Sequence, residues 1–251
     1  MIKIRDKKQN REILSAKNYT LDALQYKNLK LLQNKKGYRS SEDSLILLNI
    51  ILENIGISFS GTAFEFGTGS CIIAILLAAK LPQISITAIE VQPSLFELAQ
   101  KNIVSNHLSN RISLIEMNGK EVKSRIPFKK FDIAFSNPPF YPVGRGRLSP
   151  DEEKRNARHE ILCTMDDVIE SFDFLLKKNG LGFIIYPTFR WREFDDKIRG
   201  NTKKFVLQKY YFFRDINNRL FDDMFNNCSS SADYEKILEK SNLFVAKIKR
   251  L

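Results

Sequence analysis

The stretch Thr62-Ala63-Phe64-Glu65-Phe66-Gly67-Thr68-Gly69-Ser70 decides the fold. A short apolar run ends in two closely spaced glycines, and a second apolar run with the length of a buried helix follows at 71–80. Glycines at the carboxyl end of a strand let the backbone turn sharply and approach a ligand closely. The stretch therefore predicts the first strand and the ligand-binding turn of an open α/β sheet.

The same alternation of strand and helix continues along the chain on both sides of this turn. We expect strands at 62–66, 84–90, 112–116, 131–136, 181–186, 205–213 and 243–249, and helices at 41–55, 71–80, 93–107 and 164–178. Short connections of this kind give a doubly wound, mostly parallel seven-stranded sheet, which the last two strands close with one antiparallel member. We expect two parts: a basic, largely helical extension at 1–60, packed on a catalytic domain at 61–251.

Composition excludes several classes of protein. Of 251 residues, 43% are hydrophobic, which is enough for a packed core and too much for a disordered chain. No stretch approaches the roughly 20 apolar residues that span a bilayer, and the N-terminus lacks the apolar run of a signal peptide. The three cysteines and two histidines are widely spaced and contain no CxxC pair, so no metal site is expected. A monomer in the cytoplasm is expected.

The charge balance is strongly basic. The formal net charge is +11, and residues 3–39 hold eleven lysines and arginines against three acids. Such a surplus concentrates polyanions near the surface and suits a nucleic-acid partner. Charge alone leaves the alternative equally open, namely that the lysines merely solvate the surface.

Two acids beside the glycine turn indicate the kind of cofactor. The turn lacks the GxGxxG pattern of a dinucleotide site because residue 72 is Ile, and it is a weak signal by itself. Glu65 stands just before the glycines, where it would repel a pyrophosphate and hold a cationic amino-acid tail. Glu90 ends the second strand, where a carboxylate accepts hydrogen bonds from ribose hydroxyls. This pair favours S-adenosylmethionine over NAD.

The tetrapeptide Asn137-Pro138-Pro139-Phe140 directly follows the fourth strand. Two prolines stiffen the segment and present carbonyl oxygens, and the Asn137 side chain adds an amide oxygen. An NH2 group held between two such acceptors turns its lone pair towards an electrophilic methyl group. Phe140 offers a ring on which a planar acceptor can stack. The motif predicts methylation of an amino nitrogen.

These residues together resemble the amino-methyltransferase branch of the class I Rossmann-like methyltransferases. The segments 38–47, 157–160 and 175–180 further resemble the bacterial enzymes that form N6-methyladenine beside the anticodon of a valine tRNA, a resemblance that covers 21–186 well. It implies a tRNA substrate, with position 37 of tRNA-Val as the target. The resemblance departs from the family pattern at Cys71, where a third glycine is usual, and at Asn118, where an acid is usual.

The resemblance also assigns roles to individual residues. Those expected to act in catalysis are Asn137, Pro138, Pro139 and Phe140. Those expected to bind the cofactor are Glu65, Gly67, Thr68, Gly69, Glu90, Asn118 and Asn137, with the amide oxygen of Asn118 in place of the usual carboxylate. Those expected to contact RNA are Tyr38, Arg39, Arg145, Arg147, Arg158 and His159, although packing or solvation explains each of these equally well.

Other functions share parts of this pattern. The same chemistry serves glutamine in a release factor or adenine in ribosomal RNA, and a methyltransferase-like fold can be retained as a non-catalytic RNA-binding module. Glutamine methyltransferases carry a separate N-terminal helical bundle, whereas only about 60 residues precede the first strand here. That shortage, the basic N-terminal region and segment 157–160 favour RNA.

Overall fold

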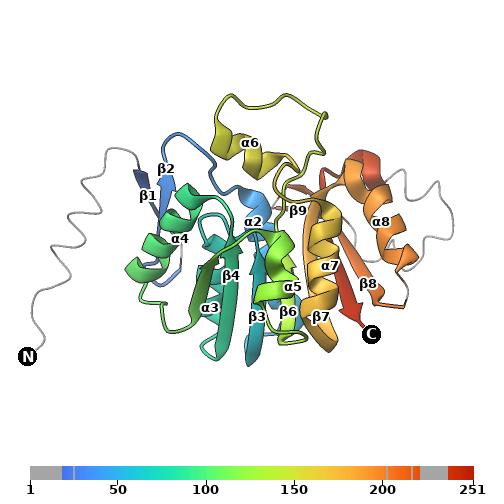
Figure 1. The fold of residues 1–251 in the computed structure, drawn as a ribbon, viewed down its shortest axis with the longest axis horizontal. Helices are drawn as coiled ribbons and strands as arrows, with labels where there is room; N and C mark the ends of the chain where they lie inside the picture. Colours follow the sequence, from blue (N-terminus) through green and yellow to red (C-terminus); the bar gives the residue numbers. More distant parts are fainter. Residues whose placement is uncertain (1–18, 25, 202, 216, 221–236) are drawn as a thin grey trace, which may run out of the picture.

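A computed structural model describes residues 19–24, 26–201, 203–215, 217–220 and 237–251. Within these ranges the main sheet has eight strands in the order β5-β4-β3-β6-β7-β10-β8-β9 (Figure 1). The strands are β3 (Gly61–Phe66), β4 (Ile84–Glu90), β5 (Ile112–Glu116), β6 (Phe131–Ser136), β7 (Leu176–Pro187), β8 (Phe205–Asp215), β9 (Asn218–Leu220) and β10 (Leu243–Arg250). The helices that flank them are α2 (Glu42–Ile55), α3 (Ile72–Lys80), α4 (Pro93–Ser105), α5 (Val122–Arg125), α6 (Glu152–Arg158), α7 (Met165–Leu175) and α8 (Trp191–Gly200).

The strand directions confirm the predicted doubly wound sheet. Strands β5, β4, β3, β6 and β7 pair in parallel, and β10 lies antiparallel between β7 and β8. The long polar connection expected before the last strand falls largely at 221–236, outside the described residues. The short strand β9 at the edge of the sheet was not predicted.

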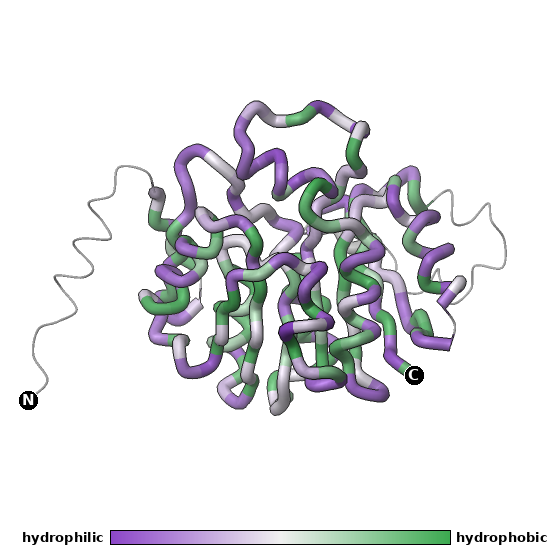
Figure 2. The backbone as a smooth tube through the Cα atoms, viewed as in Figure 1, coloured by the Kyte–Doolittle hydropathy of each residue, from purple (hydrophilic) through white to green (hydrophobic). Residues whose placement is uncertain are grey.

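Two apolar cores cover the two faces of the sheet, because side chains alternate along each strand. Ala63 belongs to the core shared with α2, α3 and α4, whereas its neighbour Phe64 belongs to the core shared with α7 and α8. The run 210–213 divides in the same way and is fully buried, so it is sheet core as predicted. Figure 2 shows the apolar colour concentrated in the sheet and its flanking helices, with polar residues along α6 above them.

Helix α7 ends earlier than the sequence predicted. The amphipathic pattern suggested a helix to residue 178, but the chain becomes β7 at Leu176, which pairs with Phe131. Lys177 then forms an ion pair with Asp132 at 2.7 Å. Pairing with the neighbouring strand outweighs the helical propensity of residues 176–178.

The expectation of a largely helical segment at 1–60 holds only for α2 among the described residues. Strands β1 (Tyr19–Ala23) and β2 (Lys30–Asn34) form an antiparallel hairpin, while residues 1–18 lie outside the described ranges. Asn102 of α4 and Asn106, the residue directly after this helix, hold the hairpin. Asn102 bonds both backbone groups of Leu32, at 2.7 and 3.0 Å, and Asn106 bonds both of Lys30, at 3.0 and 2.8 Å. The side-chain amides thereby imitate a neighbouring strand, a contact that no sequence pattern indicated.

Candidate active site

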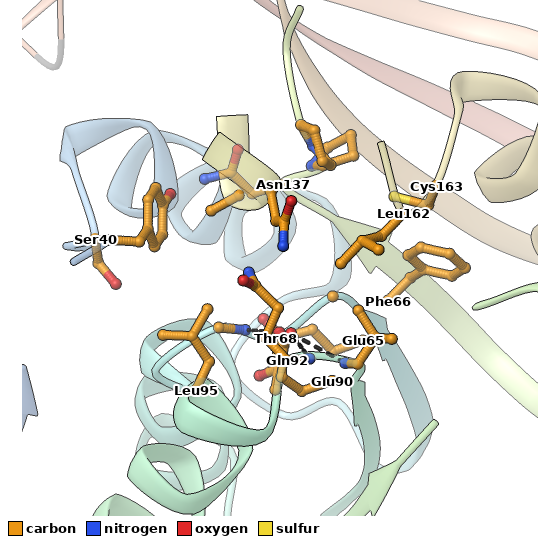
Figure 3. A pocket seen from close by; sticks show the side chains of 18 of the residues that line it. Ser40, Glu65, Phe66, Thr68, Glu90, Gln92, Leu95, Asn137, Leu162 and Cys163 are labelled. Atoms are coloured by element: carbon orange, nitrogen blue, oxygen red, sulfur yellow. Dashed lines mark hydrogen bonds between the residues drawn. The ribbon is translucent and has the colours of Figure 1, made fainter. Parts of the chain in front are cut away.

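The turns after β3, β4 and β6 meet at the carboxyl edge of the sheet and enclose a pocket (Figure 3). Its floor is polar, with Glu65, Thr68 and Glu90, and Asn137 faces this group from the opposite side. Predicted residues that line it are Tyr38, Glu65, Gly67, Thr68, Gly69, Glu90, Asn137, Pro138 and Pro139. Lining residues that the sequence analysis missed include Ser40, Ser44, Phe66, Gln92, Leu95, Asn156, Leu162 and Cys163. We call this the first pocket.

Glu65 is a buried carboxyl group at the floor of the first pocket. The Thr68 hydroxyl donates a hydrogen bond to it at 2.6 Å. Burial raises the pKa of Glu65 to about 8, against the smaller opposite effect of this hydrogen bond. A buried carboxyl group of this kind gains most from a cation placed beside it, because the cation favours its ionised form.

Glu90 is held by the backbone around it. Its Oε1 accepts hydrogen bonds from the amides of Val91 and Gln92, at 3.0 and 2.9 Å, and its Oε2 accepts one from Gly69, at 2.9 Å. Burial nevertheless raises its pKa. Because an ionised carboxylate offers about four acceptor positions, capacity remains on Oε2, next to the Gln92 side chain in the pocket.

The glycine turn has the backbone geometry that a close ligand requires. Gly67 and Gly69 adopt left-handed conformations, with φ of +68° and +57°. Cys71 also adopts one, with φ of +68°, although it is not glycine. A non-glycine residue in this region costs roughly 1–2 kcal/mol. The buried Cys71 side chain packs in the core beneath α3, which offsets part of that cost.

The orientation of Asn137 is set by one contact. Its Nδ2 donates a hydrogen bond to the hydroxyl of Ser44, a buried residue of α2, at 3.1 Å. This contact leaves Oδ1, the acceptor atom, directed elsewhere. Ser44 lies three residues after Ser41, the first non-helical residue before α2, and no local pattern assigned it a role.

A second pocket adjoins the first across the tetrapeptide. It is lined by Tyr38, Arg39, Ser41, Asp43, Asn137, Pro138, Phe140, Tyr141, Ala157 and Arg158. Four residues line both pockets, namely Tyr38, Asn137, Pro138 and Ala157. Burial, and then the charge of Asp43, raises the pKa of Tyr38 to about 12, so its hydroxyl is protonated at neutral pH. The second pocket is lined by the charged residues Arg39, Asp43 and Arg158, whereas the lining of the first is mostly apolar.

Arg190 fixes the end of the tetrapeptide from the core side. This buried guanidinium donates a hydrogen bond to the backbone oxygen of Phe140 at 3.0 Å. It also pairs with Glu160 at 3.1 Å and with Glu193 at 2.8 Å. Burial favours the neutral form of Arg190, but both carboxylates outweigh it and raise the pKa. The sequence pattern did not single out this residue.

Helix α6 lies over the carboxyl edge of the sheet and is tied to it by one carboxylate (Figure 1). Glu153 accepts hydrogen bonds from Asn34 at 2.9 Å, from the backbone amide of Tyr38 at 2.8 Å and from Ser94 at 2.6 Å. These partners come from the hairpin, the segment before α2 and the first turn of α4. Glu153 thereby fixes Tyr38 at the wall shared by the two pockets.

Four of the predicted site residues lie outside both pockets. Asn118 uses its amide oxygen to cap a short 3-10 helix, accepting from the amide of Lys120 at 3.0 Å. His159 is buried against Tyr141. Arg145 and Arg147 are exposed on the loop that precedes α6. Arg39 and Arg158 line the second pocket, where Arg39 also forms an ion pair with Asp22 at 2.9 Å.

The described ranges contain neither a metal-binding cluster nor a membrane-spanning helix. No group of three or more His, Cys, Asp or Glu side chains there is arranged to hold a metal ion. No helix in those ranges has both the length and the apolar character needed to cross a bilayer.

The part of the chain that supplies most residues of the two pockets also matches known proteins. Residues 41–162 match the family profile described as the methyltransferase small domain. A curated relative from Flavobacteriaceae bacterium strain 3519-10, named tRNA1(Val) (adenine(37)-N6)-methyltransferase, is 27% identical over 76% of this chain and 78% of its own. A relative of the same name from Porphyromonas gingivalis is 28% identical over 68% of each chain.

Solved structures share the fold at low identity. A predicted O-methyltransferase from Agrobacterium tumefaciens superposes with a TM-score of 0.55 at 13% identity, over 84% of this chain and 81% of its own. A geranyl diphosphate C-methyltransferase from Streptomyces coelicolor, solved with S-adenosyl-L-homocysteine, superposes with a TM-score of 0.54 at 8% identity. That match covers 81% of this chain and 78% of the other. The fold is thus that of the Rossmann-like methyltransferases, as the sequence predicted.

Proposed function

We propose that the chain, whose residues 41–162 match the methyltransferase small domain, methylates the exocyclic N6 amine of an adenine in tRNA. S-adenosylmethionine is the proposed methyl donor, and position 37 of tRNA-Val, beside the anticodon, is the proposed target. The curated relatives bear the name of this reaction. The observation that carries the proposal is that two adjoining pockets, the first with buried carboxyl groups and the second with basic side chains, share Asn137 and Pro138.

The residues of the first pocket fit this cofactor. Glu65 offers a buried carboxyl group to the cationic amino-acid end, and Glu90 with Gln92 offers acceptors to the ribose hydroxyls. Phe66, Leu162 and Cys163 form an apolar wall for the adenine ring. That wall takes the role first assigned to Asn118, whose amide oxygen caps the 3-10 helix. When bound, the cofactor supplies an electrophilic methyl group on a sulfonium centre.

The residues between the pockets orient the acceptor amine. Oδ1 of Asn137 and the backbone oxygen of Pro138 accept one N–H each, and Phe140 and Tyr38 flank the base from the second pocket. Holding both protons directs the nitrogen lone pair towards the first pocket. The nitrogen becomes acidic as the new bond forms, and its proton then leaves to water or to Asp43, the carboxylate that lines the second pocket. The adenine has to leave its stack to enter, as in other enzymes that act on a base.

The test uses tRNA from a strain that lacks the protein. Incubation with the purified protein and S-adenosylmethionine, followed by nucleoside mass analysis, should yield N6-methyladenosine. Asn137→Ala should abolish it while the folded protein still binds the cofactor in calorimetry. If methyl groups appear only in ribosomal RNA or in a protein fraction, the tRNA assignment is wrong. If the cofactor does not bind at millimolar concentration, the enzyme assignment is wrong.

A further inference from the structure

The basic loop at 142–147 is folded back onto the protein beside the second pocket. The amide of Arg145 donates a hydrogen bond to the backbone oxygen of Pro142 at 3.1 Å, which closes a turn. Gly146 has a φ of +76°, and a Cβ atom built on it would lie 3.3 Å from the Tyr141 ring. A glycine is therefore needed where the loop crosses this ring, and the crossing fixes where Arg145 stands.

The side chains of His159, Tyr141 and Phe189 and the guanidinium of Arg145 stack in this order beside the second pocket. The rings of His159 and Tyr141 are 5.5 Å apart, and those of Tyr141 and Phe189 are 5.6 Å apart with an interplanar angle of 29°. The Cζ atom of Arg145 lies 4.8 Å from the centre of the Phe189 ring. We call these four residues the aromatic column.

The aromatic column rises from the core to the solvent. His159 is only 2% exposed, whereas Phe189 is 42% exposed and Arg145 is exposed at the outer end. Both middle members are anchored. Phe189 directly precedes the buried Arg190, and the backbone of Tyr141 pairs with Arg158 and Glu160 on either side of His159. The buried end of the column is therefore fixed, whereas its outer end at Arg145 faces solvent.

The position of the column connects it to the proposed acceptor site. Tyr141 is a member of the column and also lines the second pocket, together with the exposed and basic Arg158. When a target base enters that pocket, the base beside it in the strand loses its stacking partner. Single-stranded bases are commonly held on aromatic rings or on the plane of an arginine guanidinium. Tyr141 thus connects the aromatic column, whose outer member is Arg145, to the pocket proposed for the target base.

We propose that the aromatic column is the seat for the RNA base next to the methylated adenine, with that base stacked on the guanidinium of Arg145. The inference rests on the proposed RNA substrate and adds a specific role for the loop. A guanidinium is planar and extends a stack, whereas a lysine ammonium at the same position supplies only charge. If Arg145 merely attracted the RNA backbone, lysine would replace it without loss.

The test compares Arg145→Lys and Phe189→Ala with a matched control, Phe128→Ala. Phe128 is also exposed, at 58%, has Lys129 at 4.8 Å over its ring and packs on Phe174 at 5.0 Å. It lies just before β6, at the opposite end of that strand from the tetrapeptide. The probe is an anticodon stem-loop RNA with 2-aminopurine beside the target adenine, because stacking quenches the fluorescence of this base. Methyl transfer to the unmodified hairpin is measured in parallel, and thermal melting checks that each variant is folded.

Wild type and Phe128→Ala should quench the probe and methylate the hairpin equally well. Arg145→Lys and Phe189→Ala should leave the probe bright and raise the KM for RNA about tenfold, with kcat little changed. If Arg145→Lys quenches and binds like wild type, the contact is one of charge and the stacking seat is refuted. If Phe189→Ala is unfolded, Arg145→Lys decides alone, since it alters only an exposed side chain.

The two proposals fail in different ways. If wild type quenches the probe but methylates no RNA, base stacking on the aromatic column is supported and the proposed methylation is contradicted. If wild type methylates the hairpin and all three variants do so equally well, the proposed methylation is supported and base stacking on the aromatic column is contradicted. If wild type neither binds nor methylates the hairpin, both fall.

Discussion

The two pockets that meet at Asn137 are built in different ways. The floor of the first is formed at the ends of β3 and β4 and in the turns that follow them, so Glu65, Thr68 and Glu90 are placed by adjoining strands. The second draws on the segment before α2, the end of the tetrapeptide and the end of α6. These segments are distant in sequence and are held together by side-chain contacts, above all those of the buried Arg190 and the partly buried Glu153. The strands themselves thus position the acidic floor of the first pocket, whereas the second pocket needs ties from outside the sheet.

The largest effect is expected where the two pockets meet. Asn137→Ala removes the side-chain acceptor for the amine, and kcat should fall about a thousandfold, in the range seen when a pre-organised transition-state contact is lost. Cofactor affinity, measured by calorimetry, should change little, because the floor of the first pocket is intact. A parallel loss of cofactor binding would mean that the two pockets form a single site and would break the comparison.

Arg190→Met tests whether the second pocket depends on its buried tie. The change leaves Glu160 without its partner in the core, and unfolding free energy measured with urea should fall by about 3 kcal/mol. The rate of methyl transfer should fall as well, because the backbone of Phe140 loses its donor. Arg199, whose side chain is 62% exposed, pairs with Asp195 in α8, the helix that follows Arg190, and provides the control.

Arg199→Met should alter stability by less than about 0.5 kcal/mol, because exposed ion pairs contribute little. If Arg190→Met is no more harmful than this control, the buried network does not hold the second pocket together.

The contrast between the pockets also explains what the sequence could predict. Strand and helix periodicity predicted the doubly wound sheet, and the glycine turn and the tetrapeptide singled out Glu65, Glu90 and Asn137, because each of these signals lies in neighbouring residues of the chain. Arg190, Glu153 and the pair Asn102 and Asn106 act across 50 to 119 positions, and such contacts leave no local pattern. Asn118 was predicted to bind the cofactor, and in the structure a local contact competes for its amide oxygen, which accepts from the amide of Lys120.

Glu65→Gln tests the role of the buried carboxyl group at the floor of the first pocket. The uncharged amide cannot pair with the cationic end of the cofactor, so cofactor affinity should fall about tenfold. In wild type the affinity should rise with pH up to about 8, because binding favours the ionised carboxyl group and releases its proton. Calorimetry in two buffers of different ionisation enthalpy measures that proton.

The stability of the free protein should show the opposite trend. The pKa of Glu65 is raised from 4.5 to about 8, so between these values the folded state binds more protons than the unfolded state. The contribution of this group to stability therefore declines as pH rises through that window. Glu65→Gln should lack the decline and be more stable than wild type above pH 8. A wild-type affinity that is flat with pH would contradict the buried, protonated carboxyl group.

Ser44→Ala is expected to have the smallest effect. Without the hydroxyl, the Asn137 amide loses the contact that fixes its orientation, and kcat should fall severalfold with little change in cofactor affinity or KM for RNA. Ser44→Thr keeps a hydroxyl and should recover most of the rate. Equal rates for Ser44→Ala and wild type would show that the tetrapeptide orients Asn137 without help from α2.

The contacts of Asn102 in α4 affect the order in which distant segments of the chain assemble. Asn102 is fully buried, and its bonding groups are satisfied only by Leu32 of the hairpin and by the backbone oxygen of Ser70 in the glycine turn. These contacts close loops of 70 and 32 residues, and contacts that close long loops form late. The glycine turn is therefore linked, through Asn102, to the docking of the hairpin at 19–34. Amide exchange at 69–71 should report the slowest step of maturation.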